Sequence, residues 1–557
     1  MSSVSTRQRV IDVVRERAER EPDRICLTFH KPDGPAESLT YEALVRDACA
    51  YARVLRAQRL TAGSMVVVTA PTAPQFVAAF LGIQQAGLIP IPAPPPEPLS
   101  GAARYRERLL DIVERSRAAA VVIPAEPPPA DLQDMLAAGG VALVTAQAAP
   151  RGSEMSEWAE PDTRIAYCQF TSGSGGRAKG VMLTHENVFA NIRARQEAYG
   201  LRDGDVGVSW LPLSHDMGLV GYILSPLMTG IPCHLMAPAA FLADPRAWLA
   251  LITRVRGTIA NAPNSAYGLC VRRVPETALD GLELSSWRRA FNGAEPVTGE
   301  VVEAFVRRFE KVGFRASAML PGYGLAENTL SVASRRAGQG AHFDVIDRDV
   351  LERLHRAVPA GADEPRLSVA SVGVPLPGQE VTIRDAGGLP CPERCIGEVT
   401  IRSASVMDGY LEGTEGEGGV DPEGWLWTGD LGYLADGELY VVGRKKDLII
   451  RAGRKYYPQD LEDAIARVPG VRSGRVAAFA VPGAERERVV VVAEHRAAPD
   501  EAAALPALID RAVFSAVRFR PDDIVLVAPQ TLPLTTSGKL MRPAVRRTYL
   551  DAGYRRS

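Results

Sequence analysis

Residues 169–181 are the stretch of this chain best suited to chemistry, because they combine small hydroxyl residues, glycines and basic side chains in one short turn. The stretch reads Gln169-Phe170-Thr171-Ser172-Gly173-Ser174-Gly175-Gly176-Arg177-Ala178-Lys179-Gly180-Val181. Glycines let backbone N–H groups approach an oxyanion, hydroxyl groups donate hydrogen bonds, and Lys179 supplies positive charge. The composition predicts a phosphate-binding loop; the alternative is a flexible Gly/Ser turn at the surface.

The common phosphate-loop and hydrolase patterns fit this loop poorly. A P-loop needs a second glycine directly before its lysine, and Ala178 stands there. The dinucleotide fingerprint is met only in its relaxed form, counted from Gly173 with Ala178 in the last place. A hydrolase elbow places serine between two glycines, whereas Gly173 lies between two serines. We therefore expect another kind of nucleotide enzyme, and a serine hydrolase is a remote alternative.

The elements on both sides must position this loop. Residues 165–170 are largely apolar and predict a strand, and Thr184 is a plausible N-cap for a helix that begins at residue 185. Residues 1–160 and 161–330 alternate helical and strand-like stretches, which is typical of layered α/β domains. From about residue 371 short β-rich pieces predict a small barrel or sheet, and an α+β domain follows residues 443–447.

The predicted architecture is therefore α/β, with two domains. A large N-terminal domain, residues 1–443, would hold layered α/β subdomains and a small β-barrel-like subdomain. A small, mobile α+β domain, residues 444–557, would follow a hinge near Lys446.

Composition limits the classes of function. The chain has 557 residues, with 64 basic and 66 acidic side chains and a net charge of −2, so its charge gives no reason to expect nucleic acid or an anionic membrane as the main partner. Seven scattered cysteines favour a reducing compartment, which we take as the cytoplasm, and Cys391 and Cys395 are interpreted as ordinary thiols. The N-terminus lacks an apolar run typical of a signal peptide, and residues 65–92, interrupted by prolines and glutamines, predict buried elements rather than a stable membrane insertion.

Two further segments lie in the first half of the chain. Residues 210–218 place Ser214, His215 and Asp216 between apolar flanks. Neighbouring side chains are expected to diverge, so these three do not predict a catalytic triad, and His215 is either a structural histidine or a substrate-orienting one. Residues 291–296 form a tight turn after a predicted strand, which alone is weak evidence for a site.

Two segments offer groups that suit a nucleotide. In residues 320–327 Tyr323 could stack on a purine while Glu327 ligates Mg²⁺; the alternative is a glycine-flanked turn with a core tyrosine. Residues 424–430 end in Asp430, which suits both hydroxyls of a ribose or a capping role.

The last two segments are basic turns. Residues 443–450 form a charged turn that leads into an apolar strand and that, alone, predicts a solvated connector. Residues 533–539 place Lys539 at the tip of a glycine-containing turn, and most such lysines are simply exposed.

In their order and spacing these segments resemble the adenylate-forming superfamily, which contains acyl-CoA synthetases, luciferases and the adenylation domains of peptide synthetases. The resemblance runs from Tyr41-Glu42-Ala43-Leu44 to Lys539. The fatty acyl-AMP ligase branch is the most similar, in residues 210–219, 262–270, 292–297, 324–327 and 453–462.

The resemblance implies a role for each candidate residue. The β- and γ-phosphates of ATP would be held by Thr171, Ser172, Gly173, Ser174, Gly175, Gly176 and Lys179. The adenine pocket would be formed by Gly293, Ala294, Glu295, Tyr323, Gly324 and Leu325, with Tyr323 stacked on the ring. Glu327 would bind Mg²⁺, and Asp430 with Arg444 would bind the ribose. His215 would lie beside the acyl carboxylate, and Lys446 would lie at the hinge. Lys539 would bridge the carboxylate and the α-phosphate.

Three positions depart from the usual superfamily pattern. Gly175 stands where the loop usually has threonine and Ala178 where it has proline. Loss of the hydroxyl could weaken one phosphate contact, whereas backbone donors remain. Ala326 replaces the usual threonine, as is typical of the fatty acyl-AMP ligase branch.

The implied activity is ATP-dependent conversion of a medium- or long-chain fatty acid to acyl-adenylate, with release of pyrophosphate, followed by transfer to the phosphopantetheine of an acyl carrier protein. ATP and Mg²⁺ are the implied cofactors. Residues 335–367 look like the insertion that marks this branch, and the alternative is a variable surface excursion. No Asp-Ser-Leu attachment site is present, so the carrier would be a separate protein. The alternatives are a fatty acyl-CoA synthetase that uses free CoA and a non-catalytic scaffold of the same fold.

Overall fold

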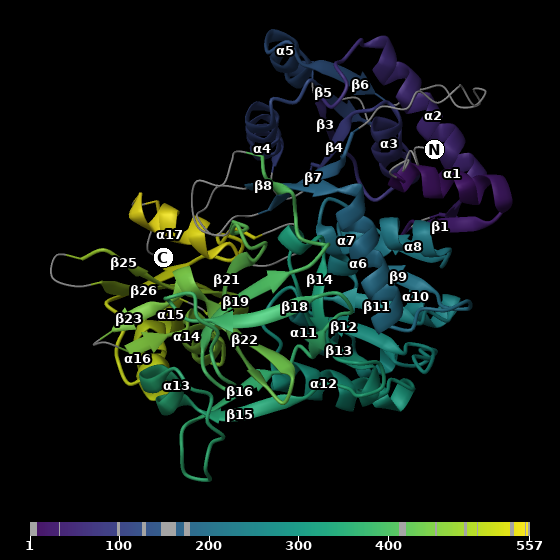
Figure 1. The fold of residues 1–557 in the computed structure, drawn as a ribbon. Helices are drawn as coiled ribbons and strands as arrows, with labels where there is room; N and C mark the ends of the chain where they lie inside the picture. The colour runs from purple at the N-terminus through teal and green to yellow at the C-terminus, as the bar shows by residue number, and fades with distance from the viewer. Residues whose placement is uncertain are drawn as a thin grey trace.

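The computed structural model describes residues 8–32, 34–96, 101–124, 130–145, 163–171, 179–411, 419–451, 454–483, 487–497, 499–534, 540–551 and 553–554. Figure 1 shows the chain path, from a purple N-terminal part through teal and green sheets to a yellow C-terminal part. The α/β architecture predicted from the sequence is confirmed, with large layered sheets followed by small C-terminal elements.

The N-terminal part contains a four-stranded sheet in the order β4-β3-β5-β6, and every neighbouring pair is parallel. Its strands and the helices of this part are α1 (Val10–Arg20), α2 (Tyr41–Ala57), β3 (Met65–Thr69), α3 (Pro74–Gln85), β4 (Ile89–Ala93), α4 (Gly101–Ser116), β5 (Ala120–Ile123), α5 (Ala130–Ala138) and β6 (Ala142–Thr145). Residues 65–92 thus form a strand, a helix and a strand, and no described helix is both long and apolar enough to cross a membrane.

The central sheet has nine strands in the order β17-β14-β13-β12-β11-β9-β10-β1-β2. The strands from β13 to β1 are parallel to one another, and β2, β14 and β17 add antiparallel edges. The strands are β1 (Ile25–His30), β2 (Glu37–Thr40), β9 (Gly207–Ser209), β10 (Cys233–Met236), β11 (Ile259–Ala262), β12 (Arg289–Asn292), β13 (Met319–Gly324), β14 (Ser331–Ser334) and β17 (Val374–Pro375). In open parallel sheets, ligands bind at the carboxyl ends of the strands.

Helices of the central region follow these strands along the chain. They are α6 (His185–Ala198), α7 (Asp216–Leu219), α8 (Ser225–Thr229), α9 (Pro238–Ala243), α10 (Arg246–Val255), α11 (Asn264–Arg273) and α12 (Gly299–Phe309). The Thr184 hydroxyl accepts from the Asn187 N–H and the Asn187 side chain accepts from the Thr184 N–H, so the predicted N-cap is confirmed as a reciprocal capping box.

Two antiparallel sheets complete the large part. One has the order β20-β8-β7, with β7 (Ile165–Thr171), β8 (Lys179–Thr184) and β20 (Gly409–Tyr410). The other has the order β18-β19-β21-β22, with β18 (Glu380–Arg384), β19 (Gly397–Arg402), β21 (Leu426–Ala435) and β22 (Glu438–Arg444). Residues 335–367 are ordered around the hairpin of β15 (Phe343–Asp347) and β16 (Arg366–Ala370), with α13 (Arg348–Leu354) between them.

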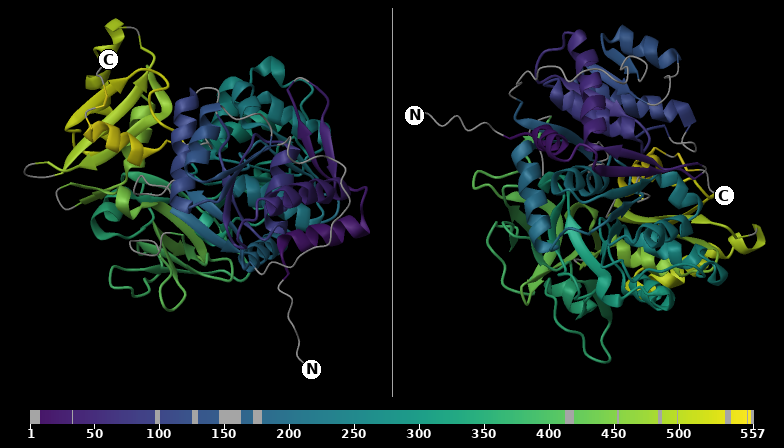
Figure 2. Two further views of the ribbon diagram at one scale, coloured as in Figure 1. Left: turned by 90° about the horizontal axis from the view of Figure 1, so that it is seen from above. Right: turned by 90° about the vertical axis from the view of Figure 1, so that its right-hand side faces the viewer.

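The C-terminal elements have hydrophobic clusters of their own, which contain no residue before Ile449. The C-terminal elements include the sheet β25-β26-β27 and lie to one side of the large part in the left view of Figure 2. The elements are β23 (Ile449–Arg451), β24 (Arg454–Tyr456), α14 (Pro458–Ala466), β25 (Val471–Val481), β26 (Arg488–His495), α15 (Pro499–Ala502), α16 (Leu505–Val517), β27 (Asp523–Val527) and α17 (Arg542–Leu550). A further buried cluster joins Tyr457 to Ile346 and Leu351 of the 335–367 segment.

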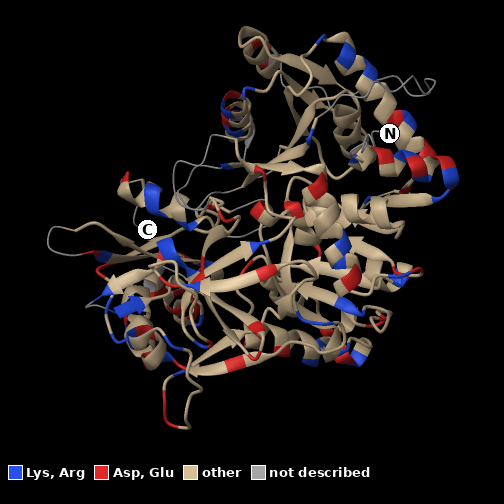
Figure 3. Cartoon of the chain, viewed as in Figure 1, with Lys and Arg blue, Asp and Glu red and all other residues tan. Residues whose placement is uncertain are grey.

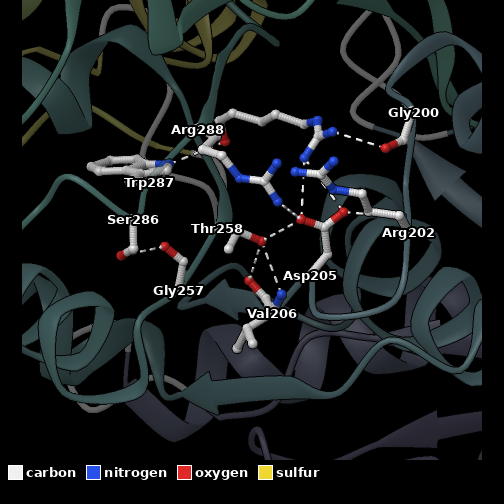
Figure 4. Close-up of polar contacts among 10 residues, drawn as sticks. Gly200, Arg202, Asp205, Val206, Gly257, Thr258, Ser286, Trp287 and Arg288 are labelled. Carbon is white, nitrogen blue, oxygen red and sulfur yellow. Dashed lines mark hydrogen bonds and ion pairs between the residues drawn. The ribbon is translucent and has the colours of Figure 1, made fainter.

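A buried ion network ties three strands of the central sheet together (Figure 4). Asp205 precedes β9 and is fully buried; its carboxylate accepts hydrogen bonds from Arg288, from the Arg289 guanidinium at 3.2 Å and from the Thr258 hydroxyl at 2.8 Å. The Arg202 N–H donates to the second oxygen at 3.0 Å. Since Thr258 precedes β11 and the arginines lead into β12, the network fixes the spacing of β9, β11 and β12.

Candidate active site

A large cleft of about 3180 Å³ lies between the large part and the C-terminal elements. Four of its wall segments follow β9, β11, β12 and β13, which are neighbours in the parallel core of the central sheet. The predicted site residues that line it are Thr171, Lys179, His215, Gly293, Ala294, Glu295, Tyr323, Gly324, Leu325, Glu327, Asp430, Arg444 and Lys446. The sheet topology therefore brings together segments that are far apart in the sequence.

Asp430 is the best-defined acceptor in the cleft. Its side chain accepts from the Tyr323 hydroxyl at 2.7 Å and from the Arg444 Nε at 2.9 Å, one donor on each carboxylate oxygen. Asp430 and Arg444 face each other in the register of β21 and β22, and Tyr323 comes from β13. The Asp430 charge raises the pKa of Arg444, so the guanidinium stays protonated at any ordinary pH. Burial, and then the Asp430 charge, raises the pKa of Tyr323 and keeps its hydroxyl a donor.

Glu327 lies nearby in a short 3₁₀ helix, Ala326–Asn328, that follows β13. Its Oε1 accepts from the Tyr410 hydroxyl at 3.0 Å, and the Lys179 Nζ lies 4.3 Å from the centroid of the Tyr410 ring. Burial raises the pKa of Glu327, while hydrogen bonds, including the one from Tyr410, oppose that rise. A carboxylate in this position, beside the end of the predicted phosphate loop, is an oxygen ligand of the kind Mg²⁺ takes together with nucleotide phosphates.

The turn after β12 approaches β13 very closely. A side chain on Gly293 would begin 2.6 Å from the Gly322 carbonyl oxygen, so only glycine fits there. Ala294 has a φ of 68°, a left-handed conformation that costs energy in a non-glycine residue. The Glu295 carboxylate accepts from the Ser265 N–H. The turn is thus held in a strained shape, and its residues Gly293, Ala294 and Glu295 line the cleft.

His215 occupies the N-cap of α7 rather than a separate position in a triad. Its Nδ1 lies 2.5 Å from Asp216 Oδ1 and also accepts from the Met217 N–H at 3.3 Å. The expectation that these neighbouring side chains diverge was wrong, because the extended N-cap backbone turns the histidine ring back over the first helical turn. The Ser214 hydroxyl has no hydrogen-bond partner among the described residues, so the triad remains incomplete.

Gln169 joins the strand before the phosphate loop to the His215 segment. Its Nε2 donates to the Ser214 carbonyl at 2.8 Å. Its Oε1 and the Asn292 Oδ1 are buried polar atoms on residues that line the cleft, and neither has a partner in the described part of the chain. Because buried polar atoms are normally satisfied, these acceptors favour water or a ligand in the cleft.

Several predicted site residues lie outside the described residues: Ser172, Gly173, Ser174, Gly175, Gly176 and Lys539. The structure describes both ends of the phosphate loop, where Thr171 pairs with Lys179 across β7 and β8. Lys446 lies in a 3₁₀ turn, Lys445–Asp447, directly after β22.

Sequence reasoning missed two polar residues of the site, Tyr410 and Gln169. The contact of Tyr410 with Glu327 joins positions 83 residues apart, so no local sequence pattern predicts it. Gln169 stands at the head of the phosphate-loop segment, and its polarity inside an apolar strand was the available signal.

Comparison with known proteins gives one family and consistent relatives. The family model described as AMP-binding enzyme matches residues 14–411. The chain is 34% identical to the medium-chain-fatty-acid–[acyl-carrier-protein] ligase JamA of Moorena producens, over 97% of this chain and 95% of that protein. It is 33% identical to the long-chain-fatty-acid–AMP ligase FadD26 of Mycobacterium marinum, over 99% of both chains.

A solved structure from a study of fatty acyl-adenylate ligases of E. coli and L. pneumophila superposes with a TM-score of 0.88, at 33% identity and 98% coverage of both chains.

Proposed function

The chain belongs to the family of AMP-binding enzymes and is a fatty acyl-AMP ligase, and we propose that it passes the acyl group of a medium- or long-chain fatty acid from acyl-adenylate to the phosphopantetheine of a separate carrier protein. The observation that supports the adenylation step is the pair of acidic sites in one cleft: Asp430 with Tyr323 and Arg444, and Glu327 with Tyr410. The similarity to an acyl-carrier-protein ligase supports the proposed acceptor.

The Asp430 site suits the ribose of ATP. A carboxylate has about four acceptor positions, and the protein fills one on each oxygen. Two positions are left for the two ribose hydroxyls, and the strained turn at Ala294 with the Tyr323 ring would form the adenine pocket.

The first step joins two anions, the fatty carboxylate and the triphosphate. A carboxylate oxygen forms a bond to the α-phosphorus, the bond from that phosphorus to the bridging oxygen breaks, and pyrophosphate leaves with the electron pair. Lys179, at the edge of the phosphate loop, would offset the negative charge, and His215 would orient the carboxylate. Glu327 would hold Mg²⁺, which neutralises phosphate charge when bound.

In the second step, the phosphopantetheine thiol loses its proton to solvent and its sulfur forms a bond to the acyl carbon. The bond between that carbon and the adenylate oxygen breaks, and AMP leaves. No step requires a redox partner.

We further assign residues 1–443 and 444–557 to two domains with a hinge near Lys446. The two hydrophobic clusters that lie wholly after residue 448 support this division, and Tyr457 packs in a third cluster against the larger domain. Closure of the small domain would bring Lys539 to the α-phosphate only when substrates are bound. None of the seven cysteines, all within the described residues, forms a disulfide, which favours a reducing compartment such as the cytoplasm.

Product analysis by mass spectrometry tests the proposal. The enzyme is incubated with ATP, Mg²⁺ and a panel of fatty acids, in parallel with free CoA, with holo carrier protein and with neither. We expect acyl-AMP without an acceptor and acyl carrier protein with one. Abundant acyl-CoA would instead indicate a fatty acyl-CoA synthetase, and absence of any fatty-acid-dependent pyrophosphate release would indicate a non-catalytic protein.

The same assay tests the assignment of Lys539. Lys539→Ala should retain ATP binding but lower acyl-AMP formation by roughly 10² to 10³-fold, by analogy with loss of one preorganised donor. An unchanged adenylation rate would exclude this role.

A further inference from the structure

The outward face of α16 combines an exposed aromatic ring with arginines. On the inward face Ile509, Val513 and Val517 are buried in the core of the small domain. On the opposite face, one helical turn apart, lie Arg511 and Phe514, and Phe514 is 42% exposed. The helix is therefore amphipathic, but its outer face carries a large apolar side chain that the fold leaves in solvent.

One arginine contacts this ring, and two others lie near it in the sequence. The Arg520 guanidinium carbon lies 5.3 Å from the Phe514 ring centroid, and Arg520 also contacts Asp510. Arg518 directly follows the helix and is exposed. The side chains of Arg511 and Arg518 form no hydrogen bond or ion pair with any residue that the structure describes. Their charges thus remain available to a partner.

The α16 face adjoins the mouth of the active-site cleft. Ala512, Ser515 and Ala516 line the cleft from the same helix. The Arg348 guanidinium of α13 donates to the Ala516 carbonyl at 3.2 Å, so α16 lies directly beside α13, as Figure 1 also shows. A partner seated on Phe514 would stand at an entrance to the cleft.

Charge is divided unequally along the chain. Residues 449–557 hold 18 Lys and Arg against 12 Asp and Glu, whereas the rest of the chain holds 46 against 54. Figure 3 shows Lys and Arg on several of the C-terminal elements. Residues 449–557 therefore carry a net charge of +6 and the rest of the chain a net charge of −8, which favours an acidic partner at this end of the chain.

We propose that Phe514, Arg511 and Arg518 form the docking surface for the acyl carrier protein, which would present acidic side chains to the arginines and an apolar side chain to the ring. The inference rests on the proposed function, because it names where the acceptor of that reaction binds. Aromatic and arginine side chains are the residue types enriched at protein interfaces. A membrane is the poorer occupant, since a single exposed ring gives little apolar area to insert.

Separate assays of the two half-reactions test the inference. The variants are Phe514→Ser and the double variant Arg511→Glu with Arg518→Glu; Arg496→Glu, an exposed arginine of the same domain that does not line the cleft, is the matched control. We expect the kcat/KM for holo carrier protein to fall about 10- to 100-fold in both docking variants. Fatty-acid-dependent pyrophosphate release should match the parent protein and the control.

The outcomes separate this inference from the proposed function. Parent enzyme that acylates carrier protein, with docking variants that do so equally well, overturns the docking surface alone. Parent enzyme that releases pyrophosphate but acylates no member of a panel of recombinant holo carrier proteins overturns both. Variants that lose binding to phosphatidylglycerol vesicles, yet keep full transfer to carrier protein, would assign the face to a membrane and overturn the inference.

Discussion

Two aspartates, Asp205 and Asp430, each pair with arginine, yet they stand in opposite situations. Asp205 is fully buried, and the protein fills its acceptor positions with two arginines, a hydroxyl and a backbone N–H. Asp430 is 6% exposed and receives one donor on each oxygen, and its partner Arg444 has a side chain that is 47% exposed. The number of hydrogen-bond donors that the protein provides, rather than burial or charge, therefore distinguishes a structural carboxylate from one with acceptor positions left for a ligand.

Replacing Asp205 should have the largest effect on stability. Asp205→Ala leaves Arg288 and Arg289 without their counter-ion at the junction of three strands, and breaking a buried ion pair from one side costs about 3–5 kcal/mol. Urea unfolding followed by circular dichroism measures the loss. Asp203→Ala, at an exposed position in the same turn, is the control and should stay within about 0.5 kcal/mol of the parent. If Asp205→Ala lowered the free energy of unfolding by less than about 1 kcal/mol, Asp205 would not have the structural role assigned to it.

The same contrast explains what the sequence could and could not predict. The Thr184 cap, the strand before the phosphate loop and the α/β alternation depend on local patterns, and the structure has them. Asp205 gave no signal, because Thr258 and Arg288 lie 53 and 83 residues away and only the sheet brings them together. The His215 contact with Asp216 was misjudged because spacing alone ignores cap geometry.

Asp430 should show the reverse pattern. Asp430→Ala removes the acceptor for both ribose hydroxyls, and hydrogen bonds to charged groups are worth about 1.5–3 kcal/mol each, so the kcat/KM for ATP should fall about 10²- to 10⁴-fold. Because the half-exposed Arg444 can be solvated, the unfolding free energy should stay within about 1 kcal/mol of the parent. Steady-state pyrophosphate release and urea unfolding measure both.

Glu423→Gln, an exposed change near the same sheet, controls for lost charge in the Asp430 experiment. Equal destabilisation of Asp430→Ala and Asp205→Ala would show that both aspartates are structural and would end the distinction.

Protonation of Glu327 should affect stability and adenylation in opposite directions. Burial raises its pKa, so the folded protein holds the proton more tightly than the unfolded chain; this group's contribution to stability is greatest at low pH and is lost as pH rises through the raised pKa. Mg²⁺ binding needs the ionised form, so adenylation should change in the opposite direction and decline as pH falls.

Tyr410→Phe removes a donor to that ionised carboxylate, so the acid limb of the rate profile should move to higher pH and the Mg²⁺ requirement should increase. The control is Tyr433→Phe, whose hydroxyl donates to Asp344 at 2.8 Å and which does not line the cleft. Rate profiles at several Mg²⁺ concentrations, with chelator blanks, give the measurement. If the acid limb moved equally in both variants, the shift would not be due to the hydrogen bond between Tyr410 and Glu327.

Tyr323→Phe should have the smallest effect, because it removes one hydrogen bond to Asp430 and keeps the ring. Because this hydroxyl orients Asp430 and does not itself hold the ribose, we expect only about a 2- to 10-fold increase in the KM for ATP, with kcat nearly unchanged. Tyr323→Leu is the matched comparison: it also removes the stacking surface, which contributes about 1–3 kcal/mol per base. If Tyr323→Phe were as damaging as Asp430→Ala, the hydroxyl would be essential to the acceptor rather than one of its two donors. A small increase in the KM for ATP in Tyr323→Phe, together with a large increase in Tyr323→Leu, would indicate that the ring stacks on adenine while Asp430 binds the ribose.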